Sequence, residues 1–275
     1  MQKVKKSDCI ILSRSIASHK GQNGNVLVVG GSEDYTGAVY LASVAALRTG
    51  ADIVTACCPE QVGHSINSLS PDIIAIKMHG KNLGAEHFAR IMKLSKEVDV
   101  ILIGNGIGVR SGTARLIRKI VSSCKHSLKV VDADALKVLK LDEIDNAILT
   151  PNKRELYFLA NNSGMRELKM ELVQKRLGTN VIIIKGPVDI IMSSKKRFHN
   201  TTGSPGMTVA GTGDVLAGLC AGILSQSGDL LKSAVTAAYL NGKIGERLTK
   251  EKGYGFLASD FIPLIPKFFR WQVKG

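Results

Sequence analysis

The sequence lacks the cysteine patterns of disulfide-rich and zinc-binding proteins. Its five cysteines are an odd number, two are adjacent, and no C-x-x-C motif occurs. This pattern argues against a disulfide framework or a zinc site and indicates a reducing compartment. No apolar run approaches the roughly 18 residues that span a bilayer, and the short apolar run at residues 9–12 does not suit a signal peptide. We therefore expect a cytoplasmic protein with no membrane partner.

Aromatic residues are also scarce, at 5%, whereas glycine contributes 28 of the 275 residues. A core built from Ala, Val, Ile and Leu with many tight turns is typical of α/β proteins and fits a β-sandwich less well. With 44% apolar and 22% charged residues, the composition excludes disorder and fibrous repeats. The length is sufficient to bury a sizeable core.

Acidic residues are in deficit: 23 against 37 basic residues, for a net charge of +14. A basic surface attracts polyanions, including nucleic acids and phosphate-bearing small molecules. The basic residues form only short clusters, such as residues 3–6 and 195–197. Because aromatics are few and no basic helix is evident, a non-catalytic binder of nucleotides or nucleic acid is the least favoured alternative. We expect no nucleic-acid partner.

Short β-branched runs alternate with helical stretches along the whole chain. The predicted strands are residues 26–29, 53–55, 73–76, 100–103, 129–131 and 181–184, with an antiparallel hairpin at 189–193 and 195–199. The predicted helices are residues 37–49, 111–124, 152–160, 212–226 and 230–249. Continuous apolar strands separated by helices indicate a mainly parallel sheet covered on both faces. We predict one domain, residues 1–275, folded as a three-layer α/β/α sandwich whose ligands bind after the strands.

The strongest local signal is Gly211-Thr212-Gly213-Asp214, which opens a predicted helix. Glycines before a first turn leave backbone N–H groups free, and the helix dipole adds positive potential, so this turn can bind phosphate. Asp214 beside it could take a proton from a hydroxyl that attacks the phosphate. The alternative is a simple helix-stabilising acid. A Walker A loop is rejected, because Thr212 stands where its lysine is required.

Three further glycine-containing loops follow predicted strands and could face a ligand. They are residues 30–38, 104–108 and 185–189. Gly37 and Ala38 permit close backbone approach at a helix start, and the turn at 185–189 could hold a base or a ribose. The loop at 104–108 matches the Rossmann fingerprint poorly, because Val109 replaces its last glycine. For each of these loops, an ordinary structural turn remains the alternative.

Acidic and polar residues follow two more strands. Asp132 and Asp134 are two residues apart at a strand end, so we expect their side chains to point to the same side. Together they could support Mg²⁺. For Asp134, however, we favour a role as a helix cap. Thr150 or Asn152 can cap the next helix, and Glu155 suits its first turn. The functional alternative places Asn152 and Glu155 on one helical face near a metal-phosphate group.

Taken in order, these motifs resemble the ADP/ATP-dependent NAD(P)H-hydrate dehydratase family of the ribokinase-like superfamily. The resemblance covers nearly the whole chain, although each piece alone is weak. It includes residues 19–21, 26–50, 103–108, 132–136, 150–155, 185–186, 204–207, 211–218, 239–242 and 253–260.

The resemblance implies a ribokinase-like fold and the repair of hydrated NADH and NADPH. A hydroxyl of the S form of the hydrate would be phosphorylated from ADP or ATP with Mg²⁺, and phosphate would then leave. The base would be Asp214. The implied nucleotide contacts are Gly211, Thr212, Gly213, Lys185, Gly186, Pro187, Val188 and Asp189. The implied hydrate contacts are Ala38, Gly106, Gly108, Asn152 and Asp214, with Glu155 as a metal ligand.

One departure from the family concerns the residue after Thr150-Pro151. The family often has His there, whereas this chain has Asn152, which with Glu155 forms the Asn-x-x-Glu pattern of the superfamily's small-molecule kinases. A kinase for an alcohol such as a vitamin precursor is therefore the alternative function. The stretch before Val26 is too short for the epimerase domain of larger members, so a separate epimerase is expected. The resemblance also implies a homo-oligomer, with a tetramer possible, and microbial members favour ADP.

Overall fold

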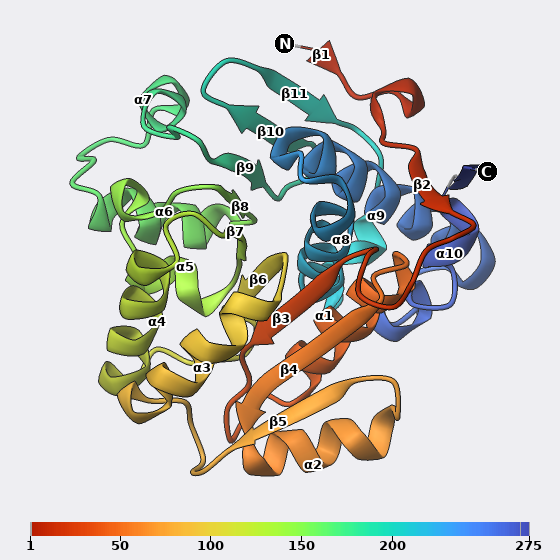
Figure 1. The fold of residues 1–275 in the computed structure, drawn as a ribbon. Coiled ribbons are helices and arrows are strands. Elements are labelled where there is room, and N and C mark those ends of the chain that lie inside the picture. The colour runs from red at the N-terminus through yellow and green to blue at the C-terminus, as the bar shows by residue number, and fades with distance from the viewer. Residues whose placement is uncertain (1, 270, 275) are drawn as a thin grey trace.

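A ten-stranded sheet runs through the middle of the computed structural model, which describes residues 2–269 and 271–274 (Figure 1). The strand order is β1-β11-β10-β9-β8-β7-β6-β3-β4-β5. The strands are β1 Gln2–Lys3, β3 Asn25–Val29, β4 Ile53–Pro59, β5 Ile74–Met78, β6 Val100–Ile103, β7 Leu128–Val131, β8 Ala147–Leu149, β9 Val181–Ile184, β10 Asp189–Ser193 and β11 Arg197–Asn200. In the described part of the chain only β10 runs against its neighbours in this sheet, and β2 Leu12–Ser15 pairs separately with β12 Trp271–Lys274.

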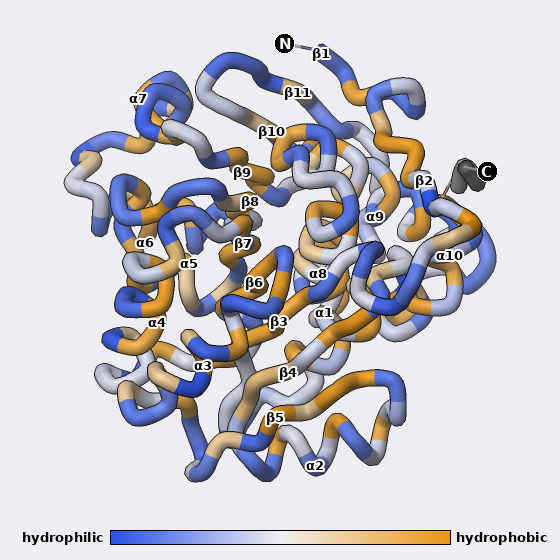
Figure 2. Tube along the Cα trace, in the orientation of Figure 1, coloured by the Kyte–Doolittle hydropathy of each residue, from blue (hydrophilic) through white to orange (hydrophobic). Residues whose placement is uncertain are grey.

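Helices cover both faces of the sheet and bury two separate apolar clusters (Figures 1 and 2). One face carries α1 Gly37–Arg48, α2 Glu60–Leu69, α8 Thr212–Ser227, α9 Leu230–Lys252 and α10 Ile265–Phe268. The other carries α3 Phe88–Leu94, α4 Ser111–Ser123, α5 Asp134–Val138, α6 Lys153–Asn162 and α7 Met170–Lys175. Along β3, Val26 and Val28 enter the first cluster while Leu27 and Val29 enter the second, as alternating side chains require. The predicted three-layer sandwich is confirmed.

Short 3₁₀ turns connect many of these elements. They are Lys6–Asp8, Ala85–His87, Ser95–Glu97, Leu141–Glu143, Pro205–Thr208 and Ala258–Phe261. None of the helices in the described residues combines the length and the apolar character that crossing a membrane requires.

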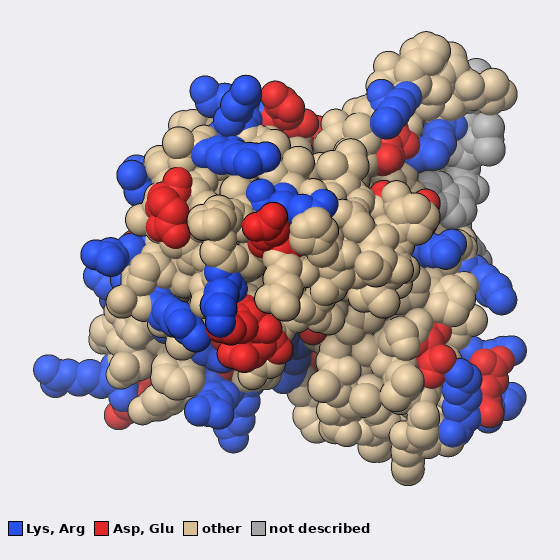
Figure 3. Space-filling model, turned by 90° about the horizontal axis from the view of Figure 1, so that it is seen from below, with Lys and Arg blue, Asp and Glu red and all other residues tan. Residues whose placement is uncertain are grey.

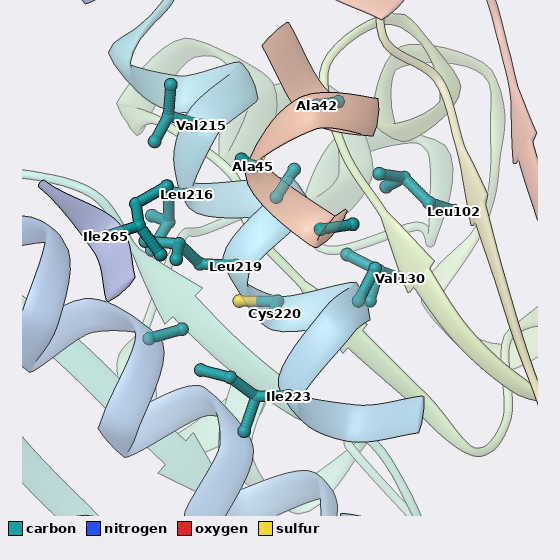
Figure 4. Packing of buried hydrophobic residues seen from close by; sticks show 14 of the residues in the cluster. Ala42, Ala45, Leu102, Val130, Val215, Leu216, Leu219, Cys220, Ile223 and Ile265 are labelled. Atoms are coloured by element: carbon teal, nitrogen blue, oxygen red, sulfur yellow. The ribbon is translucent and has the colours of Figure 1, made fainter. Parts of the chain in front are cut away.

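The contact between α1 and α8 fixes one side of the site (Figure 4). A Cβ added at Gly218 would lie 2.2 Å from the carbonyl oxygen of Ala42, and one at Gly222 would lie 2.6 Å from that of Ala46. The two helix backbones therefore pack directly against each other, as the small residues of α8 predict. This contact ties the middle of α8 to α1, the helix that follows β3.

The sequence pattern located most strands of the large sheet but missed some short elements. The predicted strand at 53–55 extends to Pro59, and the second hairpin strand begins at Arg197 instead of residue 195. The pattern missed β8, whose three apolar residues are too few to show a period, and α2, a helix that buries only Val62, Gly63 and Ile66. The two ends of the predicted domain, residues 1 and 275, lie outside the described residues.

Candidate active site

Polar side chains from four strand ends and one helix start meet at the carboxyl edge of the parallel strands. Asn105 follows β6, Asp132 follows β7, Thr150 follows β8 and Lys185 follows β9, while Asp214 lies in the first turn of α8. Hydrogen bonds link all five side chains into one network. The expected position of the site, just after the strands, is therefore where the polar groups converge.

The first turn of α8 has the geometry of an anion-binding site. Its N-cap, Gly211, has a φ of 97°, and the first helical hydrogen bond runs from the Val215 N–H to the Gly211 carbonyl at 3.0 Å. The N–H groups before Val215 therefore point beyond the helix end. Thr212 anchors the turn, because its hydroxyl donates to the carbonyl of Met207 at 2.8 Å. The backbone at residues 211–213 is thus free to face a phosphate.

Lys185 adds a positive charge beside this turn. A Cβ added at Gly213 would lie 3.3 Å from the Lys185 Nζ, so the ammonium lies against the start of the helix. Its Nζ donates to Asp132 Oδ1 at 3.0 Å and lies 3.7 Å from Glu155 Oε2. Burial opposes the charge, but Asp132 and then Glu155 outweigh it and raise the pKa of Lys185. The lysine is therefore protonated at neutral pH.

Asp214 is half-buried and accepts a hydrogen bond from Asn105 Nδ2 at 2.7 Å. Burial, followed by the negative charge of Asp132, raises the pKa of Asp214 to about 6, although Asn105 and Lys185 act in the opposite direction. Among the described residues it has no ion-pair partner within 4.0 Å. A carboxylate in this state is ionised at neutral pH and more basic than an ordinary aspartate, which suits a general base.

Asp132 is the buried centre of the network. Its Oδ1 accepts from the Thr150 hydroxyl at 2.7 Å as well as from Lys185, and its Oδ2 accepts from Asn105 Nδ2 at 3.0 Å. Each carboxylate oxygen therefore has a donor, which offsets the cost of burying the charge. This arrangement makes Asp132 a support for Lys185 and Asn105.

The expected capping role of Asp134 is wrong. Asp134 is the first residue of α5, and its carboxylate accepts from the Gly108 N–H at 2.9 Å and from Lys137 Nζ at 2.6 Å. Between the two acids, Ala133 has a φ of 49° and turns the chain. Asp132 and Asp134 consequently bind different partners and do not form a joint site. No three His, Cys, Asp or Glu side chains in the described part of the chain are placed to hold a metal.

Asn152 and Glu155 form a capping box at the start of α6. Asn152 Oδ1 accepts from the Glu155 N–H at 2.9 Å, and Glu155 Oε2 accepts from the Asn152 N–H at 2.8 Å. The capping alternative is confirmed for Asn152, whereas the Thr150 hydroxyl binds Asp132 and does not cap. Glu155 nevertheless lies within the network through Lys185, and its metal role stays a prediction.

The turn after β9 is held by Asp189. Its carboxylate accepts from the Gly186 N–H and from Asn200 Nδ2, both at 3.1 Å, and burial raises its pKa. Val188 is exposed at the tip of this turn. Since Lys185 at its base touches the start of α8, the predicted nucleotide residues at 185–189 and 211–213 are brought together. Their contact with a nucleotide stays a prediction.

Ala38 and Gly106, both predicted to contact the hydrate, also lie side by side. Gly106 has a φ of 65°, and a Cβ there would lie 3.2 Å from the Ala38 Cβ and 2.8 Å from that of Tyr35. A larger side chain at residue 106 would therefore collide with the loop after β3. The Gly108 N–H donates to Asp134, and the contact of Gly108 with the hydrate stays a prediction.

Sequence reasoning missed Asn105, which is fully buried and contacts two carboxylates. The glycines around it suggested only a tight turn. One signal was present: Asn105 is the only polar side chain in the stretch of residues 100–108.

The fold is similar to that of a ribokinase-like protein of known structure. A ribokinase-like superfamily protein from Enterococcus faecalis has a solved structure that matches with a TM-score of 0.85 at 24% identity, over 97% of this chain and 94% of that one. The three-layer sandwich is therefore of the ribokinase-like class, as the sequence resemblance implied.

The family within that class follows from the sequence comparison. The family model described as NAD(P)H-hydrate dehydratase matches residues 26–267, and the chain belongs to this family. An ADP-dependent (S)-NAD(P)H-hydrate dehydratase from Nitrosopumilus maritimus is 36% identical over 264 residues, covering 93% of this chain and 91% of the relative. A bifunctional NAD(P)H-hydrate repair enzyme from Methanothermobacter thermautotrophicus is 37% identical over 268 residues, covering 93% of this chain. The chain spans 51% of that relative's length.

Proposed function

We propose that this protein dehydrates the S form of hydrated NADH and NADPH at the expense of a nucleotide, restoring the reduced coenzymes. The observation that carries the proposal is the placement of Asp214. Its half-buried carboxylate stands in the first turn of α8, beside free backbone N–H groups and next to Lys185. This arrangement suits the transfer of a phosphoryl group to a hydroxyl. The family match supports a hydrated nicotinamide as the owner of that hydroxyl.

The proposed reaction begins with proton transfer to Asp214. The hydroxyl oxygen of the hydrate attacks the terminal phosphorus of the nucleotide, and the bond from that phosphorus to the leaving nucleotide oxygen breaks. Amide groups at residues 211–213 and the ammonium of Lys185 stabilise the negative charge on the transferring group. The lone pair of the ring nitrogen then expels phosphate from the ring, and loss of a proton from the adjacent ring carbon restores the coenzyme.

Mg²⁺ is the cofactor we propose, since it neutralises nucleotide phosphates in phosphoryl transfer. Mg²⁺ commonly binds through one or two carboxylates plus substrate phosphates instead of a protein cage. The described residues fit this mode, because they offer single carboxylates near the start of α8 and no three-residue cluster. Glu155, close to Lys185, is the residue we propose to hold the ion.

ADP is the proposed phosphoryl donor, which would leave AMP, and ATP is the alternative, which would leave ADP. The relative from Nitrosopumilus maritimus, named as ADP-dependent, supports this choice. We also propose a cytoplasmic location on the cysteine pattern, and a homo-oligomer on the family resemblance. A separate epimerase is proposed to supply the S form of the hydrate.

A small-molecule kinase is the second candidate function, on the strength of the Asn152-x-x-Glu155 pattern. In the structure this pattern forms a capping box, which accounts for both residues without a substrate. The family match favours the dehydratase. A nucleic-acid binder gains no support from Figure 3, where basic and acidic side chains are interspersed on the face shown.

Incubation with hydrated NADH, Mg²⁺ and either ADP or ATP tests the proposal. We expect the absorbance of the reduced nicotinamide to return, with AMP or ADP and phosphate released in equal amounts. Asp214→Asn is the matched control, because an amide keeps the shape and the hydrogen bond to Asn105. That variant should lose turnover by about 10³-fold or more while it still binds nucleotide. Absence of recovery with both nucleotides would contradict the proposal, and a stable phosphorylated alcohol would establish the kinase.

A further inference from the structure

Asn105 is the one amide side chain among the five residues of the network. It lies on the loop after β6 and is fully buried. Gly104 on one side has a φ of 127°, and a Cβ there would lie 1.9 Å from the carbonyl oxygen of Asp132. On the other side, the Asn105 carbonyl accepts from the Gly31 N–H at 2.9 Å. The backbone that carries Asn105 is therefore fixed against the strands on both sides.

The amide group of Asn105 is divided between two carboxylates. Its Nδ2 lies 2.7 Å from Asp214 Oδ1 and 3.0 Å from Asp132 Oδ2. Both partners only accept when ionised, so the nitrogen must face them and the orientation of the amide is determined. Among the described residues, no other group donates a hydrogen bond to the Asp214 side chain.

The oxygen of the same amide reveals what this arrangement costs. Asn105 Oδ1 is buried and has no hydrogen-bond partner among the described residues. An unsatisfied buried acceptor costs roughly 1–3 kcal/mol, a cost that an apolar side chain of the same shape would avoid. If the side chain at residue 105 only filled space, leucine would be the more stable choice, because it has no acceptor to leave unpaired. The amide is explained by what its nitrogen does for the two carboxylates.

We infer that Asn105 is the positioning residue for the proposed base: it holds the Asp214 carboxylate at the start of α8 by sharing its amide group between Asp214 and the buried Asp132. Asp132 is itself fixed by Thr150 and Lys185. Asn105 therefore connects Asp214, to which no other described group donates, to Asp132, which accepts from three donors. The inference rests on the proposed function only for its catalytic consequence.

The charged groups around Asp214 determine how its pKa would change if the Asn105 amide were removed. Asp132 from the end of β7 and Glu155 from α6 favour the protonated form, whereas Lys185 from the end of β9 favours the ionised form. Asn105 is the remaining group, and it also favours the ionised form. Without its donor, Asp214 would face Asp132 directly and would hold its proton to higher pH.

Asn105→Leu tests the inference, with Asn180→Leu as the matched control. Asn180 is also a buried amide, but its Nδ2 donates to the carbonyl of Ile144 at 2.6 Å and its Oδ1 accepts from the N–H of Ala147, at the start of β8, at 3.1 Å. The first measurement is the titration of the Asp214 carboxyl by ¹³C NMR, with the signal assigned by its loss in Asp214→Asn. We expect the titration midpoint to rise by about one pH unit in Asn105→Leu and to stay unchanged in Asn180→Leu.

The second measurement is the pH profile of turnover. The acidic limb of kcat should move upward with the titration, and kcat at pH 7 should fall roughly 10- to 100-fold, while KM for ADP changes little. Should Asn105→Leu not fold, Asn105→Ser, which keeps a shorter donor, should give a smaller shift in the same direction. A folded Asn105 variant in which Asp214 titrates as in the wild type would overturn the inference. The NMR titration needs no substrate, so a wild type inactive on the hydrate would count against the proposed function alone.

Discussion

Two lysines at opposite ends of the parallel strands, the buried Lys129 and the partly exposed Lys185, meet different surroundings. Lys129 is the second residue of β7, at the amino end of the strand. Its Nζ donates to the carbonyls of Cys124 and Ser127 and to Asp145 Oδ1, at 2.6, 2.9 and 2.9 Å. All three of its protons are used. Lys185, after β9, has one such bond, to Asp132, and a second carboxylate at 3.7 Å.

The difference in hydrogen bonding indicates that Lys129 has a structural role, whereas Lys185 is available for chemistry. The surroundings of Lys129 saturate it, so it has nothing left to offer a ligand. Lys185 keeps donor capacity and stands against the start of α8, in a network that also leaves the oxygen of Asn105 unpaired. The contrast between the saturated ammonium of Lys129 and the incompletely paired side chains of Lys185 and Asn105 marks the carboxyl ends of the strands as the place where polar groups remain available.

The largest contrast should come from Lys185→Met. We expect kcat/KM for the nucleotide-dependent reaction to fall by about 10²–10³-fold, because the variant removes the charge beside the transferring phosphoryl group. Lys129→Met should leave kcat/KM within about twofold of the wild type at a temperature where both variants are folded. Steady-state kinetics on both variants make the comparison. Equal losses of activity would show that the two lysines do not differ in role.

Lys129→Met should reduce the stability of the protein although it leaves the activity nearly unchanged. Lys129→Met leaves two backbone carbonyls and the half-exposed Asp145 without their donor, so we expect a loss of about 2–3 kcal/mol in the free energy of unfolding. Urea denaturation followed by circular dichroism measures it. A variant as stable as the wild type would mean that the ammonium of Lys129 stabilises the folded protein no more than a methionine side chain does.

The pH dependence of stability should reveal the cost of the ionised Asp214. Because its folded pKa is raised to about 6, the folded protein holds this proton more tightly than the unfolded chain. Its contribution to stability therefore falls as the pH rises from about 4 to about 6. Asp214→Asn should accordingly be more stable than the wild type by about 2 kcal/mol at pH 8, with little difference at pH 4. Thermal unfolding at the two pH values checks this, and an equal effect at both would contradict it.

The smallest effect concerns Asn152. Asn152→His removes a helix cap and should cost about 1 kcal/mol of stability. It should be tolerated in turnover, or alter the affinity for the hydrate more than that for ADP, since the residue is predicted on the hydrate side. Separate binding titrations with the two ligands decide the matter. Equal weakening of both would contradict that placement.

The sequence was sufficient to predict the frame of the site. Apolar runs such as residues 100–103 and 181–184 mark buried parallel strands, and glycines before an Ala- and Leu-rich helix mark its start, because both signals are local. The link between Asn105 and Asp214 joins residues 109 positions apart. Nothing local encodes such a pair. The same limit explains Asp134, which fits a cap by sequence but binds the N–H of Gly108 from another loop.

The glycine contact between α1 and α8 has a consequence for selectivity. Gly218 and Gly222 bring the two helices into backbone contact, and each helix begins in one half of the site: α1 has Ala38 in its first turn, and α8 has Asp214 in its first turn. Neither half can shift without unpacking the other. Under the proposed function, this helix contact would set the distance between the coenzyme and the phosphoryl donor, so the site would select its two ligands by their length.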